Sequence, residues 1–116
     1  MTVIASFDNE SLRAVCDILG DTVSGLRGTE IGQLLDSCGI DDPMPTGTKR
    51  YRLYDALDQR QTQDRCGNNV AAFINAAMNP VRYTRETALF EARRSELNVV
   101  LAFCGFQIGE DGKLRP

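Results

Sequence analysis

The sequence of 116 residues contains no histidine and no tryptophan. Without histidine the chain cannot form a Ser-His-Asp or Cys-His catalytic unit, and it cannot bind zinc through imidazole. Its adjacent acids are Asp41-Asp42, before a proline, and Glu110-Asp111, before a glycine, where they favour turns rather than acid–base chemistry. We therefore expect no catalytic residue and no enzymatic activity.

Cysteine is present at four positions, but no two cysteines form a Cys-x-x-Cys pair. Zinc sites normally take paired ligands from one tight turn, so we expect no metal site and no cofactor. Cys16, Cys38 and Cys104 fall on apolar helix faces and are expected to be buried, whereas Cys66 lies in a polar stretch and is predicted to be the accessible thiol. The sequence does not open with a secretion signal, so we expect reduced cysteines and a cytoplasmic location.

Long apolar runs are also missing, since none approaches the roughly 18 residues of a membrane helix. We therefore expect no membrane partner. With 42% hydrophobic and 25% charged residues, the composition is that of a globular domain. Because a chain of this length has room for one core, residues 1–116 are predicted to form a single domain.

Charge is unevenly distributed along the chain. Residues 1–48 carry eight acidic and two basic side chains, a balance of −6, whereas residues 49–116 carry eleven basic and eight acidic ones, a balance of +3. A polyanion would be attracted to the second part alone. Charged faces exposed to solvent, however, need no ligand to account for them.

Five segments repeat apolar residues with the spacing i, i+3, i+4, i+7, which predicts five amphipathic helices. These apolar stripes lie at 12–19, 31–38, 50–57, 70–77 and 97–104. The predicted first residues or caps are Asp8 or Asn9, Thr29, Thr48, the pair Asn68-Asn69, and a start near Thr84. The predicted stops are Gly20, Gly39, Pro80 and Gly105.

The end of the chain has a different pattern. Phe106-Gln107-Ile108 alternates with period two, and Asp111-Gly112 predicts a two-residue hairpin turn, after which 113–115 returns beside the first strand. Residues 3–7 alternate in the same way and are a candidate third strand. The predicted fold is mainly α, a compact bundle of about five short helices with a C-terminal β-hairpin, in an order that resembles a winged helix.

A basic segment, 49–52, opens the third predicted helix, which in a winged-helix domain enters the major groove of DNA or binds phosphates. At about 100° per residue, Lys49 and Arg52 share a face with Ala56, while Arg50 lies beside the apolar stripe. The residues predicted to bind nucleic acid are Lys49, Arg50, Tyr51, Arg52, Arg60, Lys113 and Arg115. Against this interpretation, the preceding loop of about ten residues is longer than an ordinary helix-turn-helix connection, and the net charge is −3.

Other basic side chains suggest local pairing. Arg93 and Arg94 lie on the fifth predicted helix with Glu86 and Glu91 nearby, and such pairs need no ligand.

Several separated segments, in order, resemble a known family. They are 26–35 (LRGTEIGQLL), 38–43 (CGIDDP), 66–70 (CGNNV), 73–80 (FINAAMNP), 82–84, 89–91, 97–98 and 110–115 (EDGKLR). Residues 24–115 resemble the N-terminal domain of a bacterial family of conserved hypothetical proteins related to abortive-infection factors, in which a similar domain precedes a C-terminal HEPN-type domain. The resemblance implies a front module of a longer protein, and it transfers no catalytic residue to this chain.

The expected function is therefore a non-enzymatic recognition or interaction module of a bacterial anti-phage, abortive-infection-like or toxin-like protein. Its expected partner is a C-terminal HEPN-type domain or another protein. The alternative is a winged-helix-like DNA- or RNA-binding domain that uses the cations named above. The oligomeric state is left open by the sequence.

Overall fold

Helices account for most of the computed structural model, which describes residues 2–116. These residues form five α-helices, two short 3-10 helices and one two-stranded hairpin, so the predicted mainly α fold with a C-terminal hairpin is confirmed. In chain order they are α1 (Asn9–Leu19), α2 (Gly28–Ser37), α3 (Lys49–Asp64), α4 (Asn68–Ala77), η1 (Pro80–Tyr83), α5 (Thr87–Leu101), η2 (Ala102–Cys104), β1 (Gln107–Ile108) and β2 (Leu114–Arg115).

The ends of the helices follow local chemistry. Asp8 caps α1 by accepting a hydrogen bond of 3.0 Å from the Ser11 N–H, and Thr48 stands at the cap of α3, both as predicted. The predicted cap Thr29 lies inside α2 instead, because Glu30 accepts the Arg27 N–H at 2.9 Å and the helix begins just after Arg27.

One other predicted helix start, that of α5, and one predicted cap, that of α4, are wrong. Helix α5 begins at Thr87 rather than near Thr84, because residues 80–83 form the separate turn η1. Helix α4 has Gly67 at its cap, and the side chains of Asn68 and Asn69 bind elsewhere.

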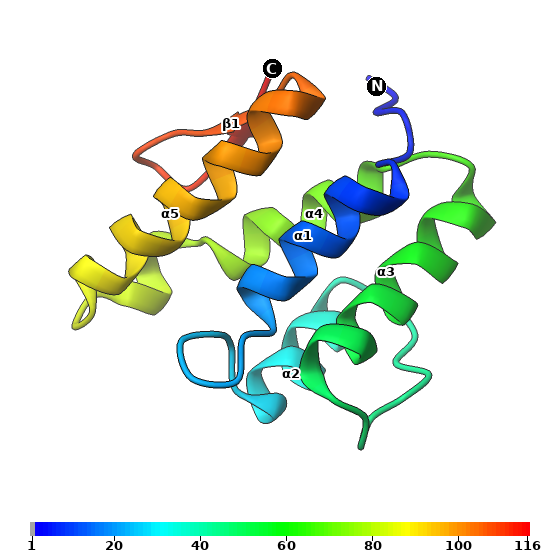
Figure 1. The fold of residues 1–116 in the computed structure, drawn as a ribbon, viewed down its shortest axis with the longest axis horizontal. Helices are drawn as coiled ribbons and strands as arrows, with labels where there is room; N and C mark the ends of the chain where they lie inside the picture. Colours follow the sequence, from blue (N-terminus) through cyan, green and yellow to red (C-terminus); the bar gives the residue numbers. More distant parts are fainter. Residues whose placement is uncertain (1) are drawn as a thin grey trace.

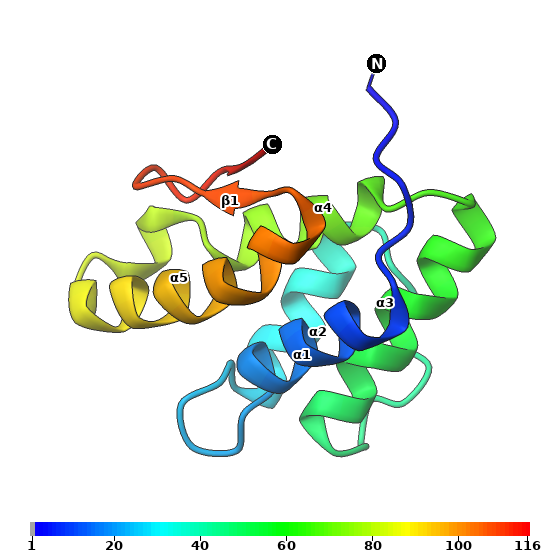
Figure 2. The same cartoon turned by 45° about the horizontal axis from the view of Figure 1, so that its top comes forward.

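The core lies where the apolar stripes meet. Helix α1 packs on α3 and α5, and α3 packs on α4, so that α1 runs between the two longer helices (Figures 1 and 2). Full burial of each large apolar side chain contributes about 1.5–3 kcal/mol. The predicted stripes supply buried Leu12, Val15, Cys16, Leu19, Ile31, Leu34, Leu35, Leu53, Leu57, Val70, Phe73, Ile74, Ala77, Leu97 and Leu101.

The apolar alternation over residues 3–7 predicts a third strand, and that prediction is wrong. The segment is extended but belongs to no sheet. Instead of a neighbouring strand, side-chain amides form hydrogen bonds with the backbone of this segment. The Ile4 N–H donates to Asn68 Oδ1 at 2.7 Å. Phe7 N–H donates to Gln61 Oε1, and Gln61 Nε2 donates back to Phe7 O, both at 2.9 Å. The first residues are thus held against α3 and the start of α4.

The hairpin turn is longer than the predicted Asp111-Gly112 turn. Strand β1 pairs antiparallel with β2. Gly112 N–H donates to Gly109 O at 2.9 Å, and Gly109 N–H donates to Lys113 O at 3.0 Å. Three residues, 110–112, therefore form the loop, with Gly112 at a φ of +77° as a hairpin with a bulge requires.

Asparagine side chains cover both outer edges of the hairpin. Asn98 accepts the Ile108 N–H at 2.7 Å, and Asn75 accepts the Leu114 N–H at 2.8 Å. The hairpin therefore packs on α5 and α4, at the opposite end of the molecule from the start of α3 (Figures 1 and 2). It does not flank that helix as a wing flanks a recognition helix. Within residues 2–116, no helix combines the length and the apolar character needed to cross a membrane.

Candidate functional site

Two of the cations predicted to contact nucleic acid hold α3 in the fold. Lys49 Nζ donates to Leu26 O at 2.8 Å. Arg52 is only 7% exposed, and its Nη2 lies 2.6 Å from Asp42 Oδ2 while its Nη1 donates to Gly28 O at 3.0 Å. Arg52 therefore anchors the loop before α3 to the start of α2, because a buried guanidinium needs its partners. A phosphate could reach the Arg52 guanidinium only by displacing those contacts, whereas Lys49 is partly exposed and its ammonium group has donors beyond the one given to Leu26.

Two further predicted cations form local ion pairs. Arg60 Nε lies 3.0 Å from Asp64 Oδ2, and the same guanidinium donates to Gly39 O. In the hairpin, Arg115 Nη1 donates to Asp111 Oδ1 at 2.9 Å. These pairs are partly or largely exposed, so solvent and salt screen them and they remain open to exchange with solvent ions.

The remaining predicted residues are exposed. The Arg50 guanidinium carbon lies 5.0 Å from the centre of the Tyr51 ring, at the start of α3, and Lys113 lies in the hairpin. Because the hairpin and the start of α3 lie at opposite ends of the molecule, the structure does not bring the seven predicted residues together into one surface (Figures 1 and 2).

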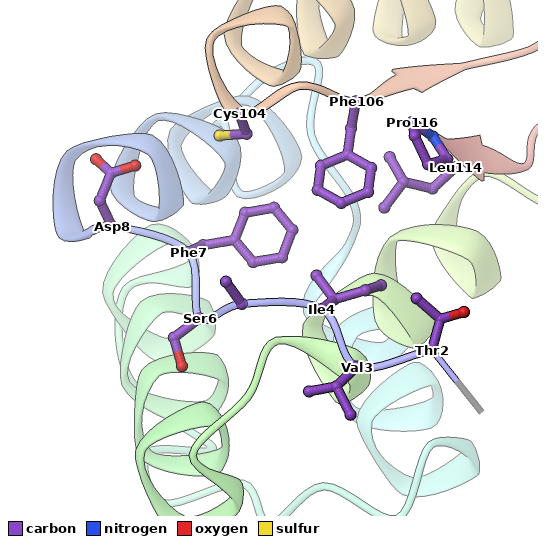
Figure 3. Close-up of a pocket in the computed structure, with 11 residues that line it drawn as sticks. Thr2, Val3, Ile4, Ser6, Phe7, Asp8, Cys104, Phe106, Leu114 and Pro116 are labelled. Carbon is purple, nitrogen blue, oxygen red and sulfur yellow. The ribbon is translucent and has the colours of Figure 1, made fainter.

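An apolar groove lies between the N-terminal segment, residues 2–8, and the end of the chain. Its volume is about 550 Å³, within the range of ligand pockets. Figure 3 shows the Phe7 ring pointing toward Phe106 and Leu114 across it. The Phe7 and Phe106 ring centres are 6.0 Å apart with planes inclined by 30°, a favourable aromatic contact that forms the groove floor.

The apolar surface continues beyond the groove. Phe103 is 86% exposed and Val99 is 65% exposed, and both line a neighbouring hollow with Ala14 on α1. Asp8 lines both the groove and this hollow, which makes the two surfaces adjacent. We call this combined surface, the groove together with Val99 and Phe103, the apolar face.

The carboxylate at the rim of the groove is engaged in structure. The Ser11 hydroxyl and N–H hold the pKa of Asp8 below its ordinary value, because both donate to the ionised carboxylate that caps α1. Asp8 is thus a helix cap at the rim of the groove rather than a free acid.

The cysteines are all free thiols. Burial raises the pKa of Cys16 far above its ordinary value, which keeps that thiol protonated. Cys38, Cys66 and Cys104 are all partly exposed, so the prediction that Cys66 alone is accessible is wrong. Across residues 2–116, no group of three or more acidic or cysteine side chains is arranged to hold a metal ion.

Sequence patterns indicate the parts of the apolar face but not the face itself. The alternation at 3–7 and at 106–108 is visible, and its natural interpretation is a shared sheet. The groove exists because Gln61 and Asn68, far along the chain, hold the first segment apart from the hairpin. One signal is available: Gln61 stands four residues after Leu57, on the buried face of α3, which marks it as a buried amide.

Comparisons of the chain with protein-family models, with curated proteins and with solved structures found no significant match. The resemblance to abortive-infection proteins therefore stays a prediction.

Proposed function

We propose that the chain is a non-enzymatic recognition module that binds an apolar segment of a partner protein on the apolar face. The observation that carries the proposal is the open groove of about 550 Å³ floored by Phe7 and Phe106 and continued by exposed Phe103. Exposed apolar patches of this kind mark interaction sites more often than ordinary surface.

A protein segment fits this face better than a small molecule. The groove alone could hold a compact ligand, but Val99 and Phe103 lie outside it on the end of α5 and η2. An occupant that covers all of these groups must extend over both hollows, as a peptide segment with several apolar side chains does.

The resemblance to abortive-infection proteins supports the same role. In that family a similar front domain precedes a HEPN-type domain, so a HEPN-type domain or its linker is the partner that the proposal favours. The module would then position or restrain an anti-phage or toxin-like activity located elsewhere. No reaction is assigned to this chain, because it lacks histidine and the carboxylate at the groove caps a helix.

The test is a selection of random twelve-residue peptides on the immobilised chain, followed by fluorescence anisotropy with the selected peptides. Two variants alter the face without touching the core: Phe103→Ser removes an exposed anchor, and Ala5→Phe fills the groove from an exposed lining position. Loss of one buried aromatic anchor, about 1.5–3 kcal/mol, predicts an affinity at least about tenfold weaker.

Val81→Ser is the matched control, because Val81 is 75% exposed and lies outside the apolar face. We expect less than about a twofold change for it. Peptides that bind the wild type, Phe103→Ser, Ala5→Phe and Val81→Ser equally would contradict the proposal, and so would a selection that returns no binder. Self-association that Phe103→Ser abolishes would assign the face to a second copy of the chain instead.

Nucleic-acid binding is a second candidate, supported by the exposed Arg50–Tyr51 pair at the start of α3. A cation beside an aromatic ring can contact a phosphate and a stacked base of a single strand. Binding of single-stranded RNA would weaken steeply with salt, and Arg50→Ala would reduce the slope by about one. No binding at low salt would eliminate this candidate.

A further inference from the structure

A second cavity, of about 350 Å³, lies on another side of the molecule from the groove and shares no lining residue with it. Its walls come from the turn at 23–25, the start of α2, η1 and α5. Three arginines and two glutamates line it: Arg27, Arg82, Arg93, Glu30 and Glu86.

Arg93 is the most unusual of these residues. It is 7% exposed, yet both of its hydrogen-bond acceptors are neutral: Tyr83 Oη and Ser24 O, each at 2.9 Å. Its Nε–H is buried and has no acceptor, and within residues 2–116 no carboxylate pairs with its guanidinium. A buried charge normally has an ionic partner, so this site lacks one negative charge.

Arg82 adds a second unused donor. Its Nη2 pairs with Glu30 Oε2, but its Nε–H is buried and unpaired in the described structure. Burial raises the pKa of Glu30, but the Arg27 N–H and the Arg82 guanidinium outweigh that effect and hold the pKa below its ordinary value. Glu30 is therefore ionised at neutral pH and is shared by two of the arginines.

The three arginines and two glutamates that line the cavity sum to a charge of +1. Glu30 pairs with Arg27 and Arg82, exposed Glu86 pairs with none of the three arginines in the described structure, and Arg93 is the buried arginine that has no ion pair. We propose that this cavity binds the carboxylate group of a small organic acid or of a peptide C-terminus. The ligand carboxylate accepts from Arg93 and Arg82, and its apolar body lies against Leu89 and Val23.

A carboxylate fits better than a phosphate monoester. One negative charge balances the site, whereas a second one would face Glu30 and Glu86 across the same small cavity. A planar carboxylate also matches the two parallel donors of a guanidinium edge, Nε and Nη2, of which Arg93 leaves the first unused. The Ser24 carbonyl, a neutral acceptor on Nη2, is the contact that the carboxylate displaces.

Arginine Nε–H resonances in nuclear magnetic resonance spectra report this site directly. The full chain is titrated with sodium acetate, benzoate and inorganic phosphate at constant ionic strength maintained with sodium chloride. We expect saturable shifts of the Arg82 and Arg93 Nε–H signals with both carboxylates, tighter binding of benzoate because of its apolar ring, and weaker binding of phosphate. No saturable shift with either carboxylate beyond the chloride control, or phosphate as the tightest ligand, would overturn the proposal.

The two sources of a carboxylate are separated with an acetylated tetrapeptide, in free-acid and amidated forms. Tighter binding of the free-acid peptide than of benzoate, lost on amidation, assigns the site to a peptide C-terminus. The reverse order assigns it to a small organic acid. Either order supports a carboxylate site, while equal binding of the amidated peptide contradicts it.

Variants test which residues act. Arg82→Gln removes one charge-assisted hydrogen bond and is expected to weaken benzoate binding about tenfold. Arg85→Gln is the matched control, since Arg85 is exposed and outside the cavity lining, and it should change affinity less than about twofold. Arg93→Lys keeps the positive charge but lacks the two parallel donors of the guanidinium edge, so it should also weaken benzoate binding. If that variant does not fold, the wild-type resonances and Arg82→Gln decide the question.

Discussion

Replacing Gln61 by leucine removes the amide that holds the first residues of the chain against α3. Gln61 is 3% exposed, and its side chain makes two hydrogen bonds of 2.9 Å with the backbone of Phe7. Leucine keeps most of the volume but leaves one buried N–H and one buried C=O unpaired. At about 1–3 kcal/mol for each group, keeping the segment in place would cost about 2–6 kcal/mol.

The chain has a less costly response, because the segment can move out into water. That movement loses the burial of Phe7, which contributes about 1.5–3 kcal/mol. We therefore expect Gln61→Leu to lower the free energy of unfolding by about 1.5–3 kcal/mol and to expose the Phe7 amide to hydrogen exchange.

Urea unfolding followed by far-ultraviolet circular dichroism measures the effect, with Gln63→Leu, an exposed position on the same helix, as the control. Equal midpoints for the two variants, or a loss below about 0.5 kcal/mol for Gln61→Leu, would refute the structural role assigned to the Gln61 amide.

Three further predictions concern stability. Arg52→Met leaves partly buried Asp42 without its guanidinium and should cost about 2–4 kcal/mol in urea unfolding; a loss below about 0.5 kcal/mol would show that the pair is not a structural anchor. Because the pKa of Glu30 is lower in the folded chain, its ionised carboxylate stabilises the fold above its ordinary pKa of 4.5, and this stabilisation is lost as pH falls through the folded-state pKa. Glu30→Gln should therefore flatten the acid side of a curve of unfolding free energy against pH, and an unchanged slope would contradict this. Gly112→Ala places a Cβ inside van der Waals contact with the Met78 carbonyl oxygen at a φ of +77°, so it should lower Tm more than Gly39→Ala, which has a φ of +67° and open space around it. Equal Tm values for the two variants would contradict the close approach.

The helices could be predicted because their signals are local. Asp8 and Thr48 stand where a cap is needed, and the apolar stripes have helical spacing, so short-range chemistry determines both the type and the approximate bounds of each element. The starts of α2 and α5 differ from the predicted ones for equally local reasons, the return of the Glu30 side chain to Arg27 and the separate turn η1.

The candidate sites depend on long-range contacts, which periodicity does not reveal. The basic segment 49–52 predicts that Arg52 contacts nucleic acid, although Arg52 shares a helix face with Ala56, and that face is buried. Sequence proximity predicts local pairing of Arg93 with glutamate. In the structure Arg94 makes such a pair, with Glu91, while Arg93 stands four residues before Leu97 on the buried face of α5. A charged residue in register with a buried stripe is the available signal in both cases.

The most direct test of the proposed module is the map of amide chemical shifts when a selected peptide binds the full chain. We expect the perturbed amides to cluster at residues 3–7, 103–108 and 114–115, and we expect Ala5→Phe to abolish the perturbations. Perturbations that cluster at residues 49–52 instead, or that persist unchanged in Ala5→Phe, would contradict the claim that the surface between the first residues and the hairpin is where this protein recognises its partner.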